Sequence, residues 1–535
     1  MNFAELAAAS MACWLASIIV FAYGMDAVGL TISPWLVLAG SLVTTGVCAG
    51  RMLGKTTREV GPLVVWAAVV SLVFAWLLRL AWPALLPPGK GPDLTHHLLL
   101  IDYIERHWRL AHDPALGAVM GEMAHYTPGA HLLAVLFGAW TRTDGFRVVY
   151  PLVSFTVALT AGFVFLITLR IASRRAPLNG VPLALIAVLL MVLPRAYVVD
   201  AFAHDSYLAQ VVSTLFAVAM WWAILVWDDA PSPAAALLIG VMALGVFLAW
   251  PVWIGPPLLA FVAWLRLRRD LPLRARAQHL AIAVVPVAML ALVHAVGRWG
   301  WMAIVGTSGA VLHPSFEAIG WAFPLLALAG IAVSLTDRRA RITLLLVAAI
   351  VAQAVALYVM ALTNHAPTPY MTYKMGYLLI YPLAVLGALS FTRVPRSAAW
   401  ATVAIMGVLV VRPLLAVPKP VPVVSRDFYD AGQWTRANVG SSCVDYLVAD
   451  AYTAYWLHLA VLGNPRASAR TAEVDQHDGR AAIARWIPAE GLPYAIADMT
   501  LLPDEIRARV TLLKQFGHAG VIARPGAIPC LPGHP

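Results

Sequence analysis

Acidic and imidazole side chains follow one another within one helical turn at residues 93–97. Asp93 is followed three and four residues later by His96 and His97, and side chains at these spacings lie next to each other on a helix. A carboxylate in such a group could act as a general base. Asp93 could also be only the N-cap of a helix that begins there, and both interpretations stay open.

Three further segments carry groups that could bind or orient a polar substrate. They are RAYVVDAFAHDSY at 195–207 with Asp200, His204 and Asp205, HPSFE at 313–317 with His313 and Glu317, and NHAPTPYMTYKMGYLLIYP at 364–382 with Tyr370, Tyr373 and Lys374. A lysine ammonium could bind a lipid phosphate as a point charge. The alternatives are solvated turns for the first two segments and interfacial anchoring by aromatic and cationic side chains for the third.

The elements that position these groups are membrane helices. The chain has 535 residues, of which 61% are apolar and 12% are charged, and its mean hydropathy is +0.78. These values exclude a soluble enzyme, a secreted module and a disordered scaffold. The net charge of +10 arises in the first 419 residues. The sequence contains no block of basic residues, so no nucleic-acid partner is predicted.

Apolar stretches long enough to cross a bilayer predict an all-α polytopic membrane protein of about thirteen transmembrane helices. The predicted spans lie near 5–23, 30–49, 61–83, 147–169, 181–198, 207–227, 232–249, 252–267, 279–296, 318–335, 342–362, 375–391 and 398–415. The start MNFAEL lacks the basic region of a signal peptide, so the first segment is expected to be a retained span.

The long connection at 84–146 is expected to hold an amphipathic helix at 93–110, with Leu94, Leu98, Ile101 and Ile104 on its apolar side and His97 on a polar side. The stretch 129–140 is too short to span and should lie in the interface. This arrangement gathers the arginines of the short loops on one side. The positive-inside rule then predicts a multi-pass plasma (inner) membrane protein with a cytoplasmic N-terminus and reactive groups on the outer side.

Residues 1–419 are therefore expected to form the membrane domain, and residues 420–535 a small extracytoplasmic α/β domain. Its helices are predicted at 425–438, 452–463 and 503–517, and its strands at 443–449, 493–498 and 519–523. The aromatic stretch 450–466 could stack on sugars, form a buried amphipathic helix or pack over the loop at 84–128. Cys443 and Cys530 could form a disulfide in an oxidising compartment. No metal-ligand or nucleotide-binding motif occurs, so no cofactor is predicted, and a divalent metal ion is an option that no motif indicates.

The acidic element PDLTHH and the surface-helix sequence HYTPGAHLLAVLFGAW resemble the GT-C superfamily of integral-membrane glycosyltransferases. In that family a large outer loop carries an acidic catalytic residue and is followed by short surface helices. The outer domain has no sequence similar to WWDYG, which argues against an oligosaccharyltransferase acting on asparagine. Asp93 also lacks the adjacent acidic partner found in several of these families.

The resemblance implies a polyprenyl-phosphate sugar donor and, as acceptor, a hydroxyl of an extracytoplasmic glycan, lipid or protein. Asp93 would be the base of an inverting hexosyl or pentosyl transfer, and Lys374 would hold the donor phosphate. His96, His97 and Asp205 would orient the acceptor or the donor. A membrane transporter or lipid-linked sugar flippase, and a glycan polymerase or ligase using lipid-diphosphate donors, are the alternatives.

Overall fold

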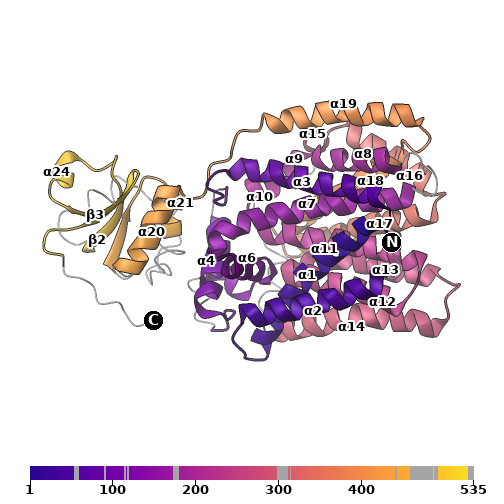
Figure 1. Cartoon of the computed structure of the whole chain (residues 1–535), viewed down its shortest axis with the longest axis horizontal. Helices are drawn as coiled ribbons and strands as arrows, with labels where there is room; N and C mark the ends of the chain where they lie inside the picture. The colour runs from indigo at the N-terminus through magenta and orange to yellow at the C-terminus, as the bar shows by residue number, and fades with distance from the viewer. Residues whose placement is uncertain are drawn as a thin grey trace.

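The structure is a computed structural model of the chain (Figure 1), and it describes residues 1–53, 59–89, 92–113, 116, 120–172, 180–297, 311–313, 315–439, 443–457, 483, 486 and 492–527. A bundle of helices occupies most of the molecule, and a small domain with a β-sheet lies beyond one end of the bundle. This architecture confirms the predicted class, a helical membrane protein with a small C-terminal α/β domain.

The helices up to residue 415 follow one another along the chain. They are α1 Phe3–Ala27, α2 Pro34–Leu53, α3 Val60–Ala81, α4 Pro92–His107, η2 Gly121–His125, α6 Gly129–Thr141, α7 Gly145–Ala172, α8 Gly180–Val192, α9 Arg195–Val198, α10 Asp200–Ala203, α11 Leu208–Asp229, α12 Pro233–Ala249, η3 Pro251–Ile254, α13 Gly255–Leu267, α14 Leu273–Gly297, α15 Phe316–Ile319, α16 Ala322–Ser334, α17 Arg338–Thr363, α18 Tyr370–Leu389 and α19 Arg396–Leu415.

Each of the thirteen predicted spans overlaps one of these helices. Within the described ranges, nine helices are long and apolar enough to cross a membrane, and several shorter apolar helices accompany them. The chain is therefore an integral membrane protein, while the count of thirteen spans stays a prediction. The span predicted at 181–198 is not one helix, because α8 stops at Val192 and α9 begins after Pro194. Proline cannot donate the helical hydrogen bond, and the chain turns there.

Burial separates the centre of the bundle from its periphery. The spans of α7 and α11 are almost entirely covered by protein, whereas those of α2 and α19 are mostly exposed. The side chains of Trp221, Trp222 and Trp227 on α11 are fully buried, and large aromatic side chains of this kind supply much of the packing area of a core. The exposed faces of α2 and α19 are apolar, as expected for helices that contact lipid.

The two ends of the bundle differ in composition. At one end α3 leads into α4, and α7, α11 and α18 begin; we call this the Asp93 end. At the other end Glu5 of α1, Arg170 of α7, Asp229 of α11 and Arg339 of α17 are joined by ion pairs; we call this the arginine end. The loops that the charge rule assigned to one side of the membrane therefore do meet at one end of the structure.

The C-terminal domain contains α20 Arg426–Asn438, β1 Val444–Leu447, α21 Ala451–Trp456, β2 Tyr494–Asp498, α24 Asp504–Arg507, β3 Thr511–Phe516 and β4 Ala519–Ala523. The four strands form one sheet in the order β1-β2-β4-β3, with β1 and β2 parallel and the other pairs antiparallel. This arrangement agrees with the predicted α/β layer.

The helix predicted at 503–517 is wrong. Only α24 is helical there, and β3 and β4 form a hairpin across Gly517, whose φ is +54°. A positive φ suits glycine in a tight turn, and the turn lets residues 511–516 pair with β4. Local apolar spacing therefore did not decide the structure of this segment, because hairpin pairing of residues 511–516 with β4 did.

Candidate active site

The loop between α3 and α4 is fixed on both sides where it approaches Asp93. The backbone N–H of Val423 donates to the carbonyl of Pro87 at 3.0 Å, and the N–H of Gly89 donates to the carbonyl of Val421 at 3.3 Å. Gly89 has a φ of +126°, and a Cβ there would lie 2.8 Å from the Oγ of Ser206. The domain linker and the segment before α11 therefore hold this loop from opposite directions.

Asp93 lies in the first turn of α4 and is exposed. Because α4 begins at Pro92, Asp93 is a residue of the helix and not its N-cap. A carboxylate in the first turn is favoured by the partial positive charge of the helix N-terminus. The position therefore suits an ionised carboxylate that solvent and a substrate hydroxyl can reach.

Lys374 lies in the first turns of α18 and is almost completely buried, with 2% of its surface exposed. Its Nζ lies 2.6 Å from the ring centroid of Tyr207, 5.0 Å from that of Tyr370 and 5.8 Å from that of Tyr377. Aromatic faces attract a cation through the ring quadrupole. The tyrosines therefore surround the ammonium group and keep it at this place.

Asp93 and Asp205 both interact electrostatically with Lys374 and with Tyr370. Residues from the loop at 84–146, from the segment before α11 and from the start of α18 thus meet at the Asp93 end. Four residues chosen from the sequence, Asp93, Asp205, Tyr370 and Lys374, belong to this group.

Tyr207 is the member that the sequence analysis did not select. It stands two residues after Asp205 in a segment already chosen for its acidic groups. Its proximity to Lys374, 167 residues later in the sequence, could not be deduced from spacing. Burial raises the pKa of the Tyr207 hydroxyl, so the ring covers the ammonium as a neutral phenol.

The two histidines after Asp93 contact protein side chains. His96 forms a hydrogen bond of 2.5 Å with the hydroxyl of Tyr455 in α21. The Nδ1 of His97 lies 2.9 Å from the Nε2 of His131 on α6. The expectation that His97 faces a polar side is wrong, because its side chain is buried between α4 and α6. Burial lowers the pKa of His131 to about 3, so this pair is held by a neutral imidazole.

The other selected residues have local partners. Asp200 accepts from Arg195 at 3.1 Å, and the Nδ1 of His204 lies 2.9 Å from a carboxylate oxygen of Asp205. The ring of His313 lies against Tyr373 with a centroid distance of 4.7 Å. The side chain of Glu317 lies outside the described residues. These groups border the Asp93 end, but no interaction with Asp93 or Lys374 is described for Asp200, His204 or His313.

The structure describes one of the two cysteines that were predicted to form a disulfide. Cys443 is disulfide-bonded, and Cys13 and Cys48 are free thiols. Cys530 lies outside the described residues, so the pairing of Cys443 with Cys530 stays a prediction. Among the side chains that the structure describes, no group of three or more His, Cys, Asp or Glu is arranged to hold a metal ion.

An apolar groove lies beside the loop between α3 and α4. The cavity has a volume of about 670 Å³ and is lined by residues Pro83, Ala84, Leu85 and Leu86 together with side chains of α1, α6 and α7. Arg147 and Arg426 also line it. A groove with apolar walls and two guanidinium groups could accept the chain of an amphiphile whose charged end lies near the loop.

Comparisons with known proteins give structural similarity only. No protein-family model matches the sequence, and no curated protein sequence matches it. Among solved structures, ArnT from Cupriavidus metallidurans bound to undecaprenyl phosphate is similar at a TM-score of 0.48 and 13% identity, over 89% of this chain and 100% of that chain.

Two further solved structures are similar to a comparable degree. The arabinofuranosyltransferase AftD from Mycobacteria gives a TM-score of 0.48 at 14% identity, over 86% of this chain and 41% of that chain. The apo oligosaccharyltransferase of Archaeoglobus fulgidus gives a TM-score of 0.48 at 12% identity, over 83% of this chain and 70% of that chain. Identities of 12–14% transfer no residue roles to this chain.

Proposed function

We propose that this chain is a GT-C-type glycosyltransferase that moves a sugar from a polyprenyl-phosphate donor to a hydroxyl group of a glycan, lipid or protein acceptor on the outer side of the membrane. The observation that carries the proposal is the meeting of an exposed carboxylate, Asp93, with a buried ammonium, Lys374, at one end of a membrane bundle. A base and a cation are the two groups that transfer from a phosphate leaving group requires.

In the proposed reaction Asp93 removes the proton of the acceptor hydroxyl. The hydroxyl oxygen bonds to the anomeric carbon, while the bond from that carbon to the phosphate oxygen breaks on the opposite face. The configuration inverts, and the polyprenyl phosphate leaves with both bonding electrons. Lys374 stabilises the negative charge that gathers on the phosphate, and Asp205 orients the groups around it.

The apolar groove beside residues 83–86 supports the lipid donor. The groove beside residues 83–86 is apolar, and its loop leads within a few residues to Asp93. A polyprenyl chain in such a groove would stay in a hydrocarbon-like environment while its phosphate reaches the boundary. We expect a hexose or a pentose as the transferred sugar.

The substitution Asp93→Asn tests the proposal, because it keeps the size of the side chain and removes the base. Transfer from a panel of undecaprenyl-phosphate hexoses and pentoses should fall by about a factor of 100 or more. Asp113→Asn is the matched control, since Asp113 is an exposed carboxylate of the same long loop, and it should keep its activity.

Two results would contradict the proposal in different ways. Substantial transfer by Asp93→Asn would remove Asp93 as the base while leaving the glycosyltransferase activity in place. The absence of transfer by the unaltered protein with every donor, together with movement of the lipid-linked sugar across the bilayer, would favour the flippase alternative.

A further inference from the structure

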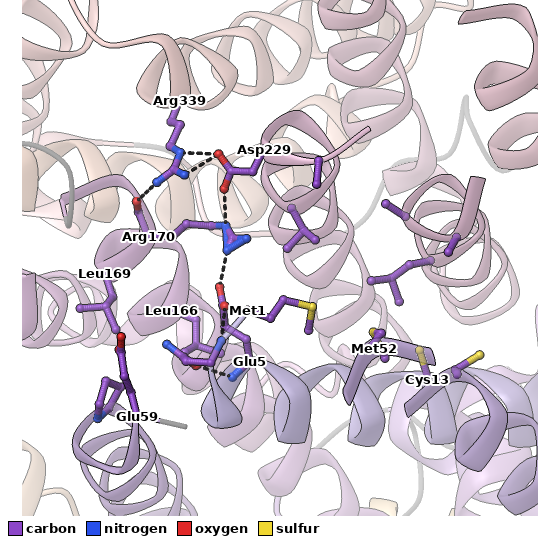
Figure 2. A pocket seen from close by; sticks show the side chains of 18 of the residues that line it. Met1, Glu5, Cys13, Met52, Glu59, Leu166, Leu169, Arg170, Asp229 and Arg339 are labelled. Carbon is purple, nitrogen blue, oxygen red and sulfur yellow. Dashed lines mark hydrogen bonds and ion pairs between the residues drawn. The ribbon is translucent and has the colours of Figure 1, made fainter. Parts of the chain in front are cut away.

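A large cavity lies at the arginine end, opposite the candidate active site. It has a volume of about 960 Å³ and is formed by α1, α2, α3, α7, α8, α11, α12, α17 and α19. Figure 2 shows part of its lining, with Glu5, Arg170, Asp229 and Arg339 following one another along one wall. The volume is within the range of cavities that hold a small ligand.

The wall of this cavity is a chain of alternating charges. Arg170 contacts Glu5 at 2.9 Å and Asp229 at 3.2 Å. Arg339 pairs with Asp229 and also donates to the carbonyl of Arg170 at 2.7 Å. The four side chains are largely buried. Two carboxylates and two guanidinium groups compensate one another here, so the wall is neutral as a whole and is held in a defined geometry.

The rim of the cavity differs from the wall. Arg51 of α2 and Arg396 of α19 both line the cavity and are exposed. Neither of them contacts a carboxylate within the described part of the chain. Glu59 is the acidic residue of the rim, so the rim has two positive charges against one negative charge. Its guanidinium groups are free to contact an anion.

The remainder of the lining is apolar and belongs partly to helices at the lipid-facing surface. Leu166, Leu238, Val241 and Trp400 line the cavity, and α2 and α19, which carry the two rim arginines, are the least buried spans. A water-soluble anion would leave these apolar walls uncovered. An amphiphile with a phosphate group would satisfy the arginines and cover the apolar surface together.

We propose that this cavity binds an anionic phospholipid, with its phosphate at Arg51 and Arg396 and an acyl chain along α12. Basic pockets between membrane helices bind anionic lipid headgroups in this manner, above all on the cytoplasmic side. The positive-inside rule assigns the arginine end to that side, where the anionic lipid would come from the adjacent leaflet. The site is separate from Asp93 and does not depend on the proposed transferase activity.

The first test compares phosphatidylglycerol with phosphatidylcholine by native mass spectrometry of the detergent-purified full chain. The unaltered protein should retain phosphatidylglycerol preferentially. The double variant Arg51→Gln/Arg396→Gln should weaken that retention by about tenfold or more, because two charge-assisted contacts are lost. The control Arg393→Gln removes an exposed arginine that stands three residues before Arg396 and does not line the cavity. This variant should retain the lipid.

A second variant fills the cavity and leaves every arginine in place. Ala234 of α12 lines the cavity and is exposed, so Ala234→Trp should fold and should reduce lipid retention. Ala404→Trp adds the same ring to an exposed position on α19 outside the cavity lining and should not reduce it. Retention lost in Ala234→Trp and kept in Ala404→Trp would support the proposal.

Three results would overturn the proposal. Equal retention of both phospholipids by the unaltered protein would indicate contact with the protein surface and no headgroup recognition. Retention of phosphatidylglycerol unchanged in both the double variant and Ala234→Trp would exclude this cavity. Displacement of the lipid by millimolar inorganic phosphate would show that the site recognises the free anion and that the apolar walls contribute nothing.

Discussion

Lys374 has an unusual position for a lysine, because its ammonium group is buried among three tyrosine rings and near two carboxylates. A buried cation is retained only where nearby groups compensate for the loss of water. Tyr207 covers the ammonium in the structure. Binding of a donor phosphate at Lys374 therefore requires the Tyr207 ring to move aside, and the phosphate would then replace the ring as the partner of the cation.

The substitution Lys374→Ala should weaken donor binding more than it slows the saturated reaction. We expect the KM for the lipid donor to rise by about tenfold or more, because a charge-assisted contact is lost, and kcat to change less. Steady-state kinetics with varied donor measure both values. Lys514→Ala, on the exposed strand β3, is the control, and an unchanged donor KM in Lys374→Ala would rule out the phosphate role.

At the scale of elements, α4 is the part that carries Asp93, and several contacts hold it. Its apolar side chains Leu94, Leu98, Ile101 and Ile104 are buried, as the sequence pattern predicted. On its other side Asp102 accepts from Arg436 of α20 at 2.7 Å. The C-terminal domain therefore packs over the long loop and restricts the movement of the helix that bears the proposed base.

The aromatic side chains of the C-terminal domain take part in this contact. Tyr429 stacks on Phe146 at the start of α7 with a centroid distance of 4.8 Å, and Trp456 lies 5.1 Å from the same ring. Tyr455 contacts His96. Since these side chains are buried against the membrane domain, they are not available to stack on a sugar. The domain is better suited to support α4 than to bind an acceptor through this face.

Glu105 gives this contact region a pH dependence. Burial, with a smaller contribution from Asp144, raises the pKa of the Glu105 carboxyl to about 7, above its usual value of 4.5. The folded state disfavours the charged carboxylate of Glu105. The contribution of Glu105 to the free energy of unfolding therefore falls as the pH rises from about 4.5 to about 7. Glu105→Gln should therefore raise the free energy of unfolding at pH 8 by roughly 2–3 kcal/mol, and the thermal midpoint should rise with it. At pH 5 the substitution should change the midpoint little.

Thermal unfolding in detergent at the two pH values measures this effect. Glu505→Gln, an exposed carboxylate of α24, is the matched control and should leave both midpoints unchanged. A lower midpoint for Glu105→Gln at pH 8 would mean that the folded state stabilises the carboxylate, which is the opposite sign.

At the scale of the whole molecule, the two ends of the bundle have separate chemistry. The Asp93 end carries the exposed carboxylate, the buried lysine and the C-terminal domain, as Figure 1 shows for α4, α20 and α21. The arginine end carries the ion-paired wall and the cavity of about 960 Å³. Arg170 and Arg339 form an ordered structure there with the carboxylates Glu5 and Asp229.

The orientation in the membrane that the arginines predict can be tested directly. An alkaline phosphatase fused after the C-terminus should be active, since that enzyme folds only outside the cytoplasm, whereas the same reporter fused after Arg393 should be inactive. A reversed pattern would place the Asp93 end in the cytoplasm. In that case a donor assembled for use on the outer side could not be the substrate.

The sequence alone determined the features that depend on local composition. Apolar stretches defined the helices of the bundle, and the spacing of apolar residues gave the buried side of α4, because a helix face repeats every three to four residues. The acidic and cationic candidates, Asp93 and Lys374, could be chosen by residue type and by their place at the ends of spans.

Only the tertiary structure decided which distant groups meet. Tyr207 covers Lys374, and His97 pairs with His131. Each of these contacts joins chain segments that are far apart in sequence. The same holds for the cavity at the arginine end, to which α1, α7, α12 and α19 contribute. Packing between helices and pairing between strands are non-local, so the periodicity of one segment carries no information about its partner.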